Sequence, residues 1–407
     1  MHIMRRFELL KVPVMARLSS SPLLAFAFRP FFLLAALYGA VSVLLWVAWL
    51  LQLAAPLPAP LSSQWHAHEM LYGFVPAAIA GFLLTAITNW TGAAPLAGRP
   101  LGLLVGLWLL GRAAMWLQGL LPYALVAALD FAFLAVLAAY VARVLVRAGN
   151  RRNLGLVAVL LALALGNALM HAAVLLPQPG LGVAGRNLGL DIVTVLMIVI
   201  AGRITPAFSA NWLRARGLPA PGAARPWHTP LAVGTAVVLA LASLLGLPDT
   251  AVGVLAVAAA AANALRLVAW AGWRVWREPL LGILHLGYAL IVVALGARGL
   301  FLVGLLDNPS LWYHALGVGA IGVLIVGVMT RVSMGHTGRP LRLLPGAGFI
   351  YLAIIAATAL RLATAAAVLP YSTGLALSAL AWAVGLLLFV ALYGPILLRP
   401  RADGRPG

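Results

Sequence analysis

The stretch FFLLAALYGAVSVLLWVAWL, residues 31–50, carries no charged side chain from end to end. About twenty apolar residues in succession are what an α-helix needs to cross about 30 Å of hydrocarbon. The rest of the chain is similarly apolar, since 64% of its 407 residues are hydrophobic and only 9% are charged. No soluble domain can bury so much apolar surface. The sequence therefore predicts an all-α polytopic membrane protein.

Short polar dividers separate the apolar runs, and counting the runs gives about twelve transmembrane helices. Dividers such as TGAAPLAGRP (91–100) and RGLPAPGAARP (216–226) are rich in Gly and Pro, which break helices. The predicted cores are 31–53, 67–89, 101–120, 124–146, 154–176, 187–208, 229–246, 251–272, 280–305, 313–334, 346–368 and 373–397. The connections are too short to hold a separate domain. We therefore expect an N-terminal segment (1–30), a single twelve-span domain (31–398) and a C-terminal tail (399–407).

Arginine is distributed unevenly among the predicted loops. Both ends of the chain are basic, and alternate loops between them carry arginine, as at 147–152, 214–225 and 339–342. Cytoplasmic loops are enriched in Lys and Arg, so we expect both termini in the cytoplasm. The net charge of +19 then indicates a bilayer with anionic headgroups as the partner rather than nucleic acid. The run at 31–50 is expected to stay as the first span, because further spans follow it, rather than to be removed as a signal peptide.

Cysteine is absent from the sequence. Its absence excludes disulfides, thiolate metal sites, iron–sulfur clusters and covalent attachment of haem. A metal ion in this protein must therefore be held by histidine, methionine, carboxylate or backbone oxygen.

Four of the eight histidines are expected at one depth, near the outer ends of three spans. His66 and His68 lie in WHAHEMLYGF (65–74) at the start of the second span, His171 near the end of the fifth and His314 at the start of the tenth. The acids expected near the same depth are Glu69, Asp130 and Asp191. Intramembrane histidine is costly without a partner, and neutral imidazole binds both metal ions and haem. The alternative is that each histidine bonds a neighbouring carbonyl or interfacial water.

The spacing within WHAHEM limits how its side chains can converge. Residues two apart on a helix point about 200° apart, so His66 and His68 cannot both face one small metal ion from a regular helix. Either one faces the bundle and the other the interface, or the helix end is unwound. His66, Glu69 and Met70 share a face. Glu69 is then either a ligand or a partner that orients an imidazole.

The tenth span is rich in glycine after its histidine, in HALGVGAIGVLIVGVMTR from His314. Small residues allow helices to approach closely, and they also leave room for a flat macrocycle. On the second interpretation, His314 and a histidine of the second span would ligate one haem from opposite faces.

Spans two, six and ten end in similar sequences, TNWTGAAPLAGRP from Thr88, TPAFSANWLRARGLP from Thr205 and TRVSMGHTGRP from Thr330. The similarity predicts three pseudo-repeats of four spans, which would bring these helices together around a centre. Common loop chemistry would produce the same similarity.

Four motifs occur in order between residues 28 and 339: FRPFFLLAALYG, WHAHEMLYGF, GRITPAFSANWL and HALGVGAIGVLIVGVMTRVSMGHTGR. Together they resemble the NnrS family of bacterial membrane proteins. The resemblance implies a twelve-span inner-membrane protein that contains haem and copper. It also implies a link to denitrification and to protection against nitric oxide stress, without specifying an enzymatic activity.

On this resemblance we expect a protein that handles or senses nitric oxide or its iron–nitrosyl products. His68 and His314 are the expected ligands of a non-covalent b-type haem, with Arg186 near a propionate or paired with Asp191. The remaining candidates for copper are His66 and His171, together with Glu69.

Two other classes of function fit the same sequence. Twelve spans with repeats are common in transporters, here of a metal ion, haem or a small anion. A transporter needs polar groups that continue through the membrane, whereas the predicted middle is mostly apolar apart from residues such as Thr85, Asn167 and Thr194, with His285 farther in. The third class is an assembly protein that binds no cofactor.

Overall fold

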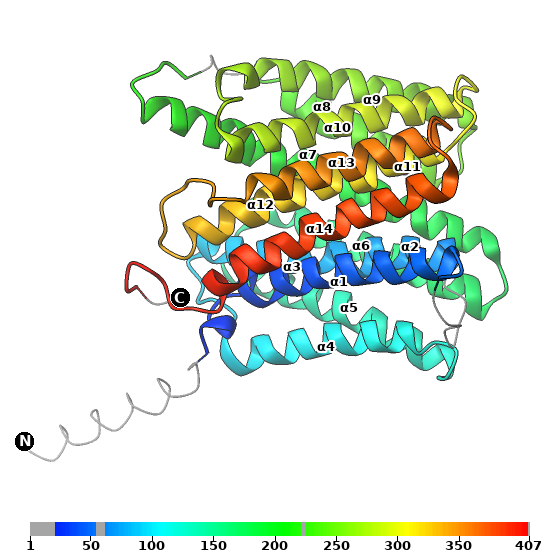
Figure 1. The fold of residues 1–407 in the computed structure, drawn as a ribbon, viewed down its shortest axis with the longest axis horizontal. Helices are drawn as coiled ribbons and strands as arrows, with labels where there is room; N and C mark the ends of the chain where they lie inside the picture. The colour runs from blue at the N-terminus through cyan, green and yellow to red at the C-terminus, as the bar shows by residue number, and fades with distance from the viewer. Residues whose placement is uncertain (1–20, 54–61, 221–224, 406–407) are drawn as a thin grey trace, which may run out of the picture.

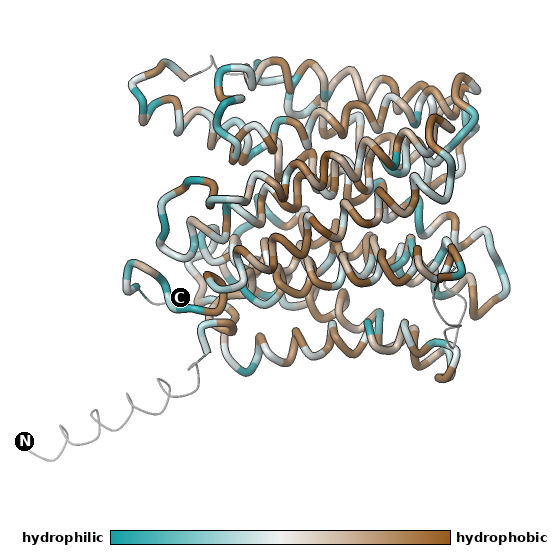
Figure 2. Tube along the Cα trace, viewed as in Figure 1, coloured by the Kyte–Doolittle hydropathy of each residue, from teal (hydrophilic) through white to brown (hydrophobic). Residues whose placement is uncertain are grey.

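The protein is described by a computed structural model, which covers residues 21–53, 62–220 and 225–405 and contains helices but no strand within those ranges. The helices pack side by side and run back and forth along one direction, so the loops gather at the two ends of the bundle (Figure 1). Colouring by hydropathy shows apolar residues along the middle of the bundle and polar residues mainly at its ends (Figure 2). This arrangement is the all-α bundle that the sequence predicts.

Twelve helical segments of the described chain make up the bundle. They are α1 (Phe28–Leu50), the composite of α2 (Ser63–His68), η3 (Glu69–Phe74) and α3 (Val75–Thr91), α4 (Gly98–Trp116), α5 (Tyr123–Arg147), α6 (Gly155–Leu175), α7 (Pro179–Arg214), α8 (His228–Leu244), α9 (Asp249–Ala269), α10 (Pro279–Leu302), the composite of α11 (Ser310–His314), η6 (Ala315–Ile321) and α12 (Gly322–Gly335), α13 (Gly348–Ala365), and α14 (Tyr371–Leu397). Short 3₁₀ turns are η2 (Pro22–Leu24), η4 (Arg151–Asn153) and η5 (Gly272–Arg274). Each long segment coincides with one predicted span, which confirms the fold class.

Ten of these segments are long and apolar enough to cross a bilayer by themselves. The other two are α8, which has only 17 residues, and α4, whose mean hydropathy is lowered by Arg99 and Arg112. Both lie alongside the other helices (Figure 1). The Arg112 side chain is buried and contacts Glu69 and Asp130 on neighbouring helices. Both helices are part of the bundle because they pack against its other helices, although neither is long or apolar enough to cross a bilayer by itself.

Large apolar side chains point outward as well as inward. Leu103, Leu161 and Val254 are each more than half exposed, as contact with lipid tails requires. Inside the bundle, small residues allow close packing. A Cβ on Gly185 of α7 would lie 2.5 Å from the carbonyl oxygen of Gly166 on α6, so these helices touch backbone to backbone.

The start of α1 and the end of α14 lie on the same side of the bundle (Figure 1). The buried guanidinium of Arg29 donates to the carbonyl oxygens of Leu397 at 2.8 Å and Arg399 at 2.7 Å. These bonds satisfy carbonyls that the helix end leaves without a helical partner. An even number of spans requires this arrangement, while the identity of that side as cytoplasmic stays a prediction. Residues 1–20 of the predicted N-terminal segment lie outside the described ranges.

Spans two, six and ten meet inside the bundle. The segment η3 contacts α7, α7 contacts η6, and α12 contacts α3. These are the three helices that the sequence similarity predicts around a common centre. The three-fold repeat itself stays a prediction.

Two of these three central helices contain a π-helical segment immediately after a histidine. The segment η3 begins after His68, and η6 begins after His314. In η3 the N–H of Val75 donates to Met70 O, and in η6 the N–H of Gly322 donates to Gly317 O, each five residues back. Such segments are rare and frequently occur at functional sites.

Candidate functional site: a buried histidine cluster beside a large cavity

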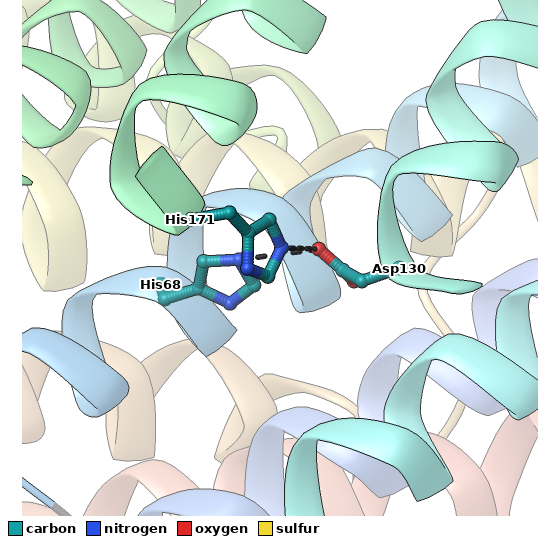
Figure 3. Close-up of side chains that lie close together, drawn as sticks. All are labelled: His68, Asp130 and His171. Carbon is teal, nitrogen blue, oxygen red and sulfur yellow. Dashed lines mark hydrogen bonds and ion pairs between the residues drawn. The ribbon is translucent and has the colours of Figure 1, made fainter. Parts of the chain in front are cut away.

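The four outer histidines separate into two pairs. The helix α2 is regular through His68, so His66 and His68 point in opposite directions. His68 lies next to His171 and Asp130, as Figure 3 shows, whereas His66 and His314 line a cavity between spans two and ten. His68 is not part of the lining of that cavity. The structure therefore does not bring together the expected pair of His68 and His314.

The first group is a cluster of His68, Asp130 and His171, contributed by α2, α5 and α6. The nitrogen and oxygen atoms that each offers to a ligand lie within 4.8 Å of one another. Asp130 Oδ2 is 2.9 Å from His171 Nε2 and 3.2 Å from His68 Nε2. All three side chains are buried. Three helices thus converge on one carboxylate oxygen.

Glu69 and Arg112 surround this cluster and complete it. Glu69 Oε1 is 2.8 Å from His68 Nδ1, and its other oxygen is 2.5 Å from Arg112 Nη1. Arg112 also contacts Asp130 through its second terminal nitrogen, and Tyr38 donates its hydroxyl to Glu69. Glu69 thus contacts the ring nitrogen of His68 that points away from Asp130, which is the geometry of the second of the two roles that the sequence left open.

The charges in the cluster do not cancel. Two carboxylates, Glu69 and Asp130, accompany one guanidinium, Arg112, so the net charge is −1 when both histidines are neutral. A buried charge without a partner is strongly unfavourable. Both ring nitrogens of His68 face oxygen acceptors, since Nε2 is also 3.2 Å from Asn167 Oδ1. A proton on each nitrogen, or a metal cation at Nε2, satisfies both the geometry and the charge.

Hydrogen bonds hold the remaining atoms of the cluster in place. Asn167 donates its amide to Asp130 Oδ2 at 2.9 Å, and the Tyr123 hydroxyl is 3.2 Å from His171 Nδ1. Each histidine thus uses Nδ1 to contact an oxygen and turns Nε2 toward Asp130. This division of roles is typical of histidines that ligate a metal ion.

The second group lines a cavity of about 610 Å³. Its walls are mostly aromatic and aliphatic side chains from α1, α2, η3, α7, α11, η6, α13 and α14. The His66 ring stacks on Trp46, with ring centroids 4.0 Å apart, and its Nδ1 is buried without a hydrogen-bond partner. On the tenth span Gly317 faces open space, because a Cβ there would meet no atom within 4 Å.

The imidazole of His314 is fixed by its own helix. His314 Nδ1 lies 2.8 Å from Ser310 O and 3.0 Å from Ser310 Oγ. A carbonyl oxygen only accepts hydrogen bonds, so Nδ1 carries the proton and Nε2 keeps its lone pair. Arg361 of α13 donates to the same Ser310 Oγ at 2.9 Å. His314 is therefore in the tautomer whose Nε2 is available to bind a metal ion.

Two arginines line this cavity, and no Asp or Glu is among the described residues of its wall. Arg186 donates to the Tyr313 hydroxyl at 2.7 Å, and Arg361 bonds Ser310, so both contacts are with neutral groups. Arg186 does not pair with Asp191, which instead contacts Arg298 of α10. A largely apolar cavity with two guanidinium groups suits a ligand that is apolar over most of its surface and carries negative charge at one end.

The four histidines and Glu69, which the sequence predicts in one layer, lie in two adjacent groups around α2, and sequence reasoning missed several of their partners. Asp130 and Asn167 were noted as polar residues within spans without being assigned to the site. Arg112 and Arg361 were not considered. The available signal was a charged residue inside an apolar span, which in membranes marks a paired or functional group.

These features define a polytopic helical membrane protein with a buried histidine–carboxylate cluster next to a cationic cavity. The chain belongs to the NnrS family, because the family model described as "NnrS protein" matches residues 22–401. That range includes every long helix and both histidine groups. A comparison with curated proteins gives no match.

Proposed function

We propose that this NnrS-family protein binds haem in the large cavity and a copper ion at the histidine cluster, and that it acts in the response to nitric oxide or in its metabolism. The observation that carries the proposal is the separation of four histidines into two sites of different size and charge. One is small, buried and net negative. The other is large, mostly apolar and positively charged.

The cavity fits a haem. Its volume of about 610 Å³ is typical of sites for organic ligands, which range from about 300 to 1,000 Å³. Haem has an apolar face and two carboxylates, and the cavity offers an apolar wall together with Arg186 and Arg361. His66 and His314 are the candidate iron ligands, and only the second belongs to the pair expected from sequence. With one of these two histidines as its ligand, the iron of a bound haem would keep a coordination position for a diatomic gas such as nitric oxide.

The cluster fits a copper ion. Two imidazole nitrogens and one carboxylate oxygen suit copper, zinc or iron, and the net charge of −1 favours a cation. Glu69 behind His68 forms the carboxylate–histidine arrangement that orients many metal-binding imidazoles. The choice of copper among these metals rests on family membership. Copper would supply one-electron chemistry beside the haem cavity.

The two sites share one short segment of chain. His66 and Met70 line the cavity, while His68 and Glu69 belong to the cluster. Because these four residues lie within little more than one helical turn, a ligand in one site fixes the backbone that carries the other. This sharing supports one joint function for the two sites.

The depth of both sites supports a location near the periplasmic face. The helices α2 and α11 lie at the end of the bundle opposite to the start of α1 and the end of α14 (Figure 1). Basic loops gather on the side of the chain ends, and basic loops are typical of the cytoplasmic side.

The test is an absorption spectrum of the detergent-purified protein, oxidised and reduced, with metal analysis of the same sample. We expect a b-type haem spectrum that His66→Ala and His314→Ala shift or abolish and that nitric oxide perturbs. His171→Ala should remove the metal and keep the haem. His228→Ala, at the opposite end of the bundle, is the matched control and should change neither. A colourless protein made with ample haem, or spectra that do not respond to these changes, would overturn the proposal.

A transporter would require a different kind of centre in the bundle. It needs polar groups along a pathway, whereas the cavity between α3, α7 and α12 is lined by apolar side chains. Uptake of metal ions by proteoliposomes of the haem-free protein would favour that alternative.

A further inference from the structure

A second, smaller cavity lies between spans two, six and ten. Its volume is about 90 Å³, and every side chain that lines it is apolar. The main contributions come from α3, α7 and α12. Neither the histidine cluster nor the proposed haem site uses this space.

The small cavity continues the large one along the bundle axis. On α7, Leu190 lines the large cavity and Val193 lines the small one; on span ten, Ile321 and Leu324 follow the same order. Three residues of helix advance about 4.5 Å, so the two spaces are stacked one turn apart. Val75 lines both.

Several of the side chains that line the small cavity are not fully packed. Ile79, Met197 and Val328 line it, and each is partly exposed rather than buried. The middle of the bundle, between its two more polar ends, is mainly apolar (Figure 2). The small cavity therefore adjoins the large one, and its loosely packed wall consists of apolar side chains throughout.

The apolar wall of the small cavity determines which kinds of ligand it can bind. A space without polar groups does not hold water or ions, because neither finds a hydrogen-bond partner there. An apolar protein cavity of about 150 Å³ holds benzene or xenon, so one of about 90 Å³ suits something smaller than benzene. Uncharged diatomic gases fit this size, and they dissolve in hydrocarbon, which surrounds the bundle at this depth.

We propose that the small cavity is a binding site for apolar gas molecules that enter from the bilayer, and that it delivers them past Val75 to the large cavity. The identification of the delivered gas as nitric oxide rests on the proposed function. The gas site itself rests only on the shape and chemistry of spans two, six and ten.

Xenon tests the site without haem or activity. The full-length protein in detergent or lipid, under xenon pressure, should show bound xenon between α3, α7 and α12 by crystallography or ¹²⁹Xe NMR. Val193→Phe fills the space and should remove the xenon. Ala78→Phe fills the same space from α3 and replaces Val193→Phe if that variant does not fold. Val136→Phe, on the lipid-facing side of α5, adds the same bulk elsewhere and should leave xenon binding intact.

Carbon monoxide rebinding after flash photolysis tests delivery in the haem-loaded protein. The bimolecular rate should fall about tenfold in Val193→Phe, which corresponds to about 1.4 kcal/mol of added barrier, with the haem spectrum unchanged. The rate should stay unchanged in Val136→Phe. Unchanged rebinding in Val193→Phe would overturn delivery through this cavity, and absence of xenon in the unmodified protein would overturn the site. Bound xenon in a protein that never takes up haem would keep the gas site while rejecting the proposed function.

Discussion

At the residue scale, Glu69 shows how a carboxylate is kept inside a membrane protein. It has no solvent exposure, and its oxygens contact Tyr38, His68 and Arg112. A lone buried carboxylate would be strongly unfavourable, and each of these contacts stabilises its charged form. Helical spacing had placed Glu69 with His66 and Met70 on one face. The side chain instead turns to His68, its neighbour in sequence.

Replacing Glu69 by glutamine tests its role behind His68. Glu69→Gln keeps the size of the side chain and removes its charge, so the imidazole loses an anionic acceptor and the cluster loses its net negative charge. We expect metal affinity to fall by about 10–100-fold, the usual effect of losing such a partner. A competition titration with a chromophoric chelator measures it.

The control for this change is Asp249→Asn, at an exposed helix start outside both sites. It removes one negative charge and should leave the affinity unchanged. Equal affinities for Glu69→Gln and the unmodified protein would show that Glu69 does not support a metal ligand.

At the element scale, the junctions between α-helix and π-helix decide which way the histidines point. One residue of an α-helix turns it by about 100°, so the extra residue of a π turn rotates everything before it relative to everything after it. In span two, Pro76 assists the change, because it has no N–H to bond a carbonyl in the preceding turn. In span ten, Gly317 and Gly319 serve the same purpose by lowering the cost of irregular backbone.

Deleting Gly317 tests the junction in span ten. The deletion allows a continuous α-helix and rotates His314 away from the cavity while keeping the packing of α12. We expect a protein that still elutes as a single species in detergent but loses most of its haem, measured as haem per polypeptide. Deletion of Asp307, in the exposed loop before α11, is the matched control and should retain haem. Full haem content after loss of Gly317 would mean that the π segment does not position the ligand.

The longest helix, α7, illustrates how an element tolerates a break inside the membrane. Pro206 lies within it and cannot donate to Gly202 O, its normal helical partner. Arg266 of α9 donates to that carbonyl at 3.2 Å and to Ile198 O at 2.9 Å. The buried guanidinium thus satisfies a backbone group that neither water nor the helix itself can reach.

At the scale of the whole molecule, the chain ends are tied together by contacts that no single helix predicts. Arg29 joins α1 to the end of α14, and the tail returns to the loop after α12, where Ala402 donates to Thr337 O at 3.0 Å. In that tail Arg401 hydrogen-bonds Asp403 and lowers the pKa of the carboxyl to about 2. The start of α1 and the described tail after α14 therefore lie at the same end of the bundle.

Cysteine labelling tests which side this is, and the natural absence of cysteine gives a clean background. We expect Asp307→Cys, in the outer loop before α11, to react with a membrane-impermeant maleimide on cells whose outer membrane has been made permeable. Ala402→Cys, in the exposed tail, should react only after the inner membrane is opened. The reverse pattern would place the histidine cluster on the cytoplasmic side and would contradict the predicted orientation.

A feature of this protein could be predicted from the sequence when it depends on one segment of the chain, and could not when it depends on contacts between distant helices. Ten of the spans were predictable because their own apolar length is enough to cross a bilayer, and the Gly- and Pro-rich dividers marked α4 and α8 as well. The depth of His66, His68, His171 and His314 followed from their places within those spans. Asp130 and Arg112 were missed as site residues because their role comes from contacts with other helices, between residues that lie 18 to 62 positions apart along the chain.

The sequence by itself determined that this is a twelve-helix membrane protein of the NnrS family with four histidines toward one end of the bundle. These features could be determined because hydropathy and the order of motifs are read directly from the amino-acid sequence. Only the tertiary structure decided that His68 belongs with His171 and Asp130, and His66 with His314. That pairing depends on how each helix is rotated about its axis, and the rotation is set by π turns and neighbouring helices rather than by the spacing of residues within one span.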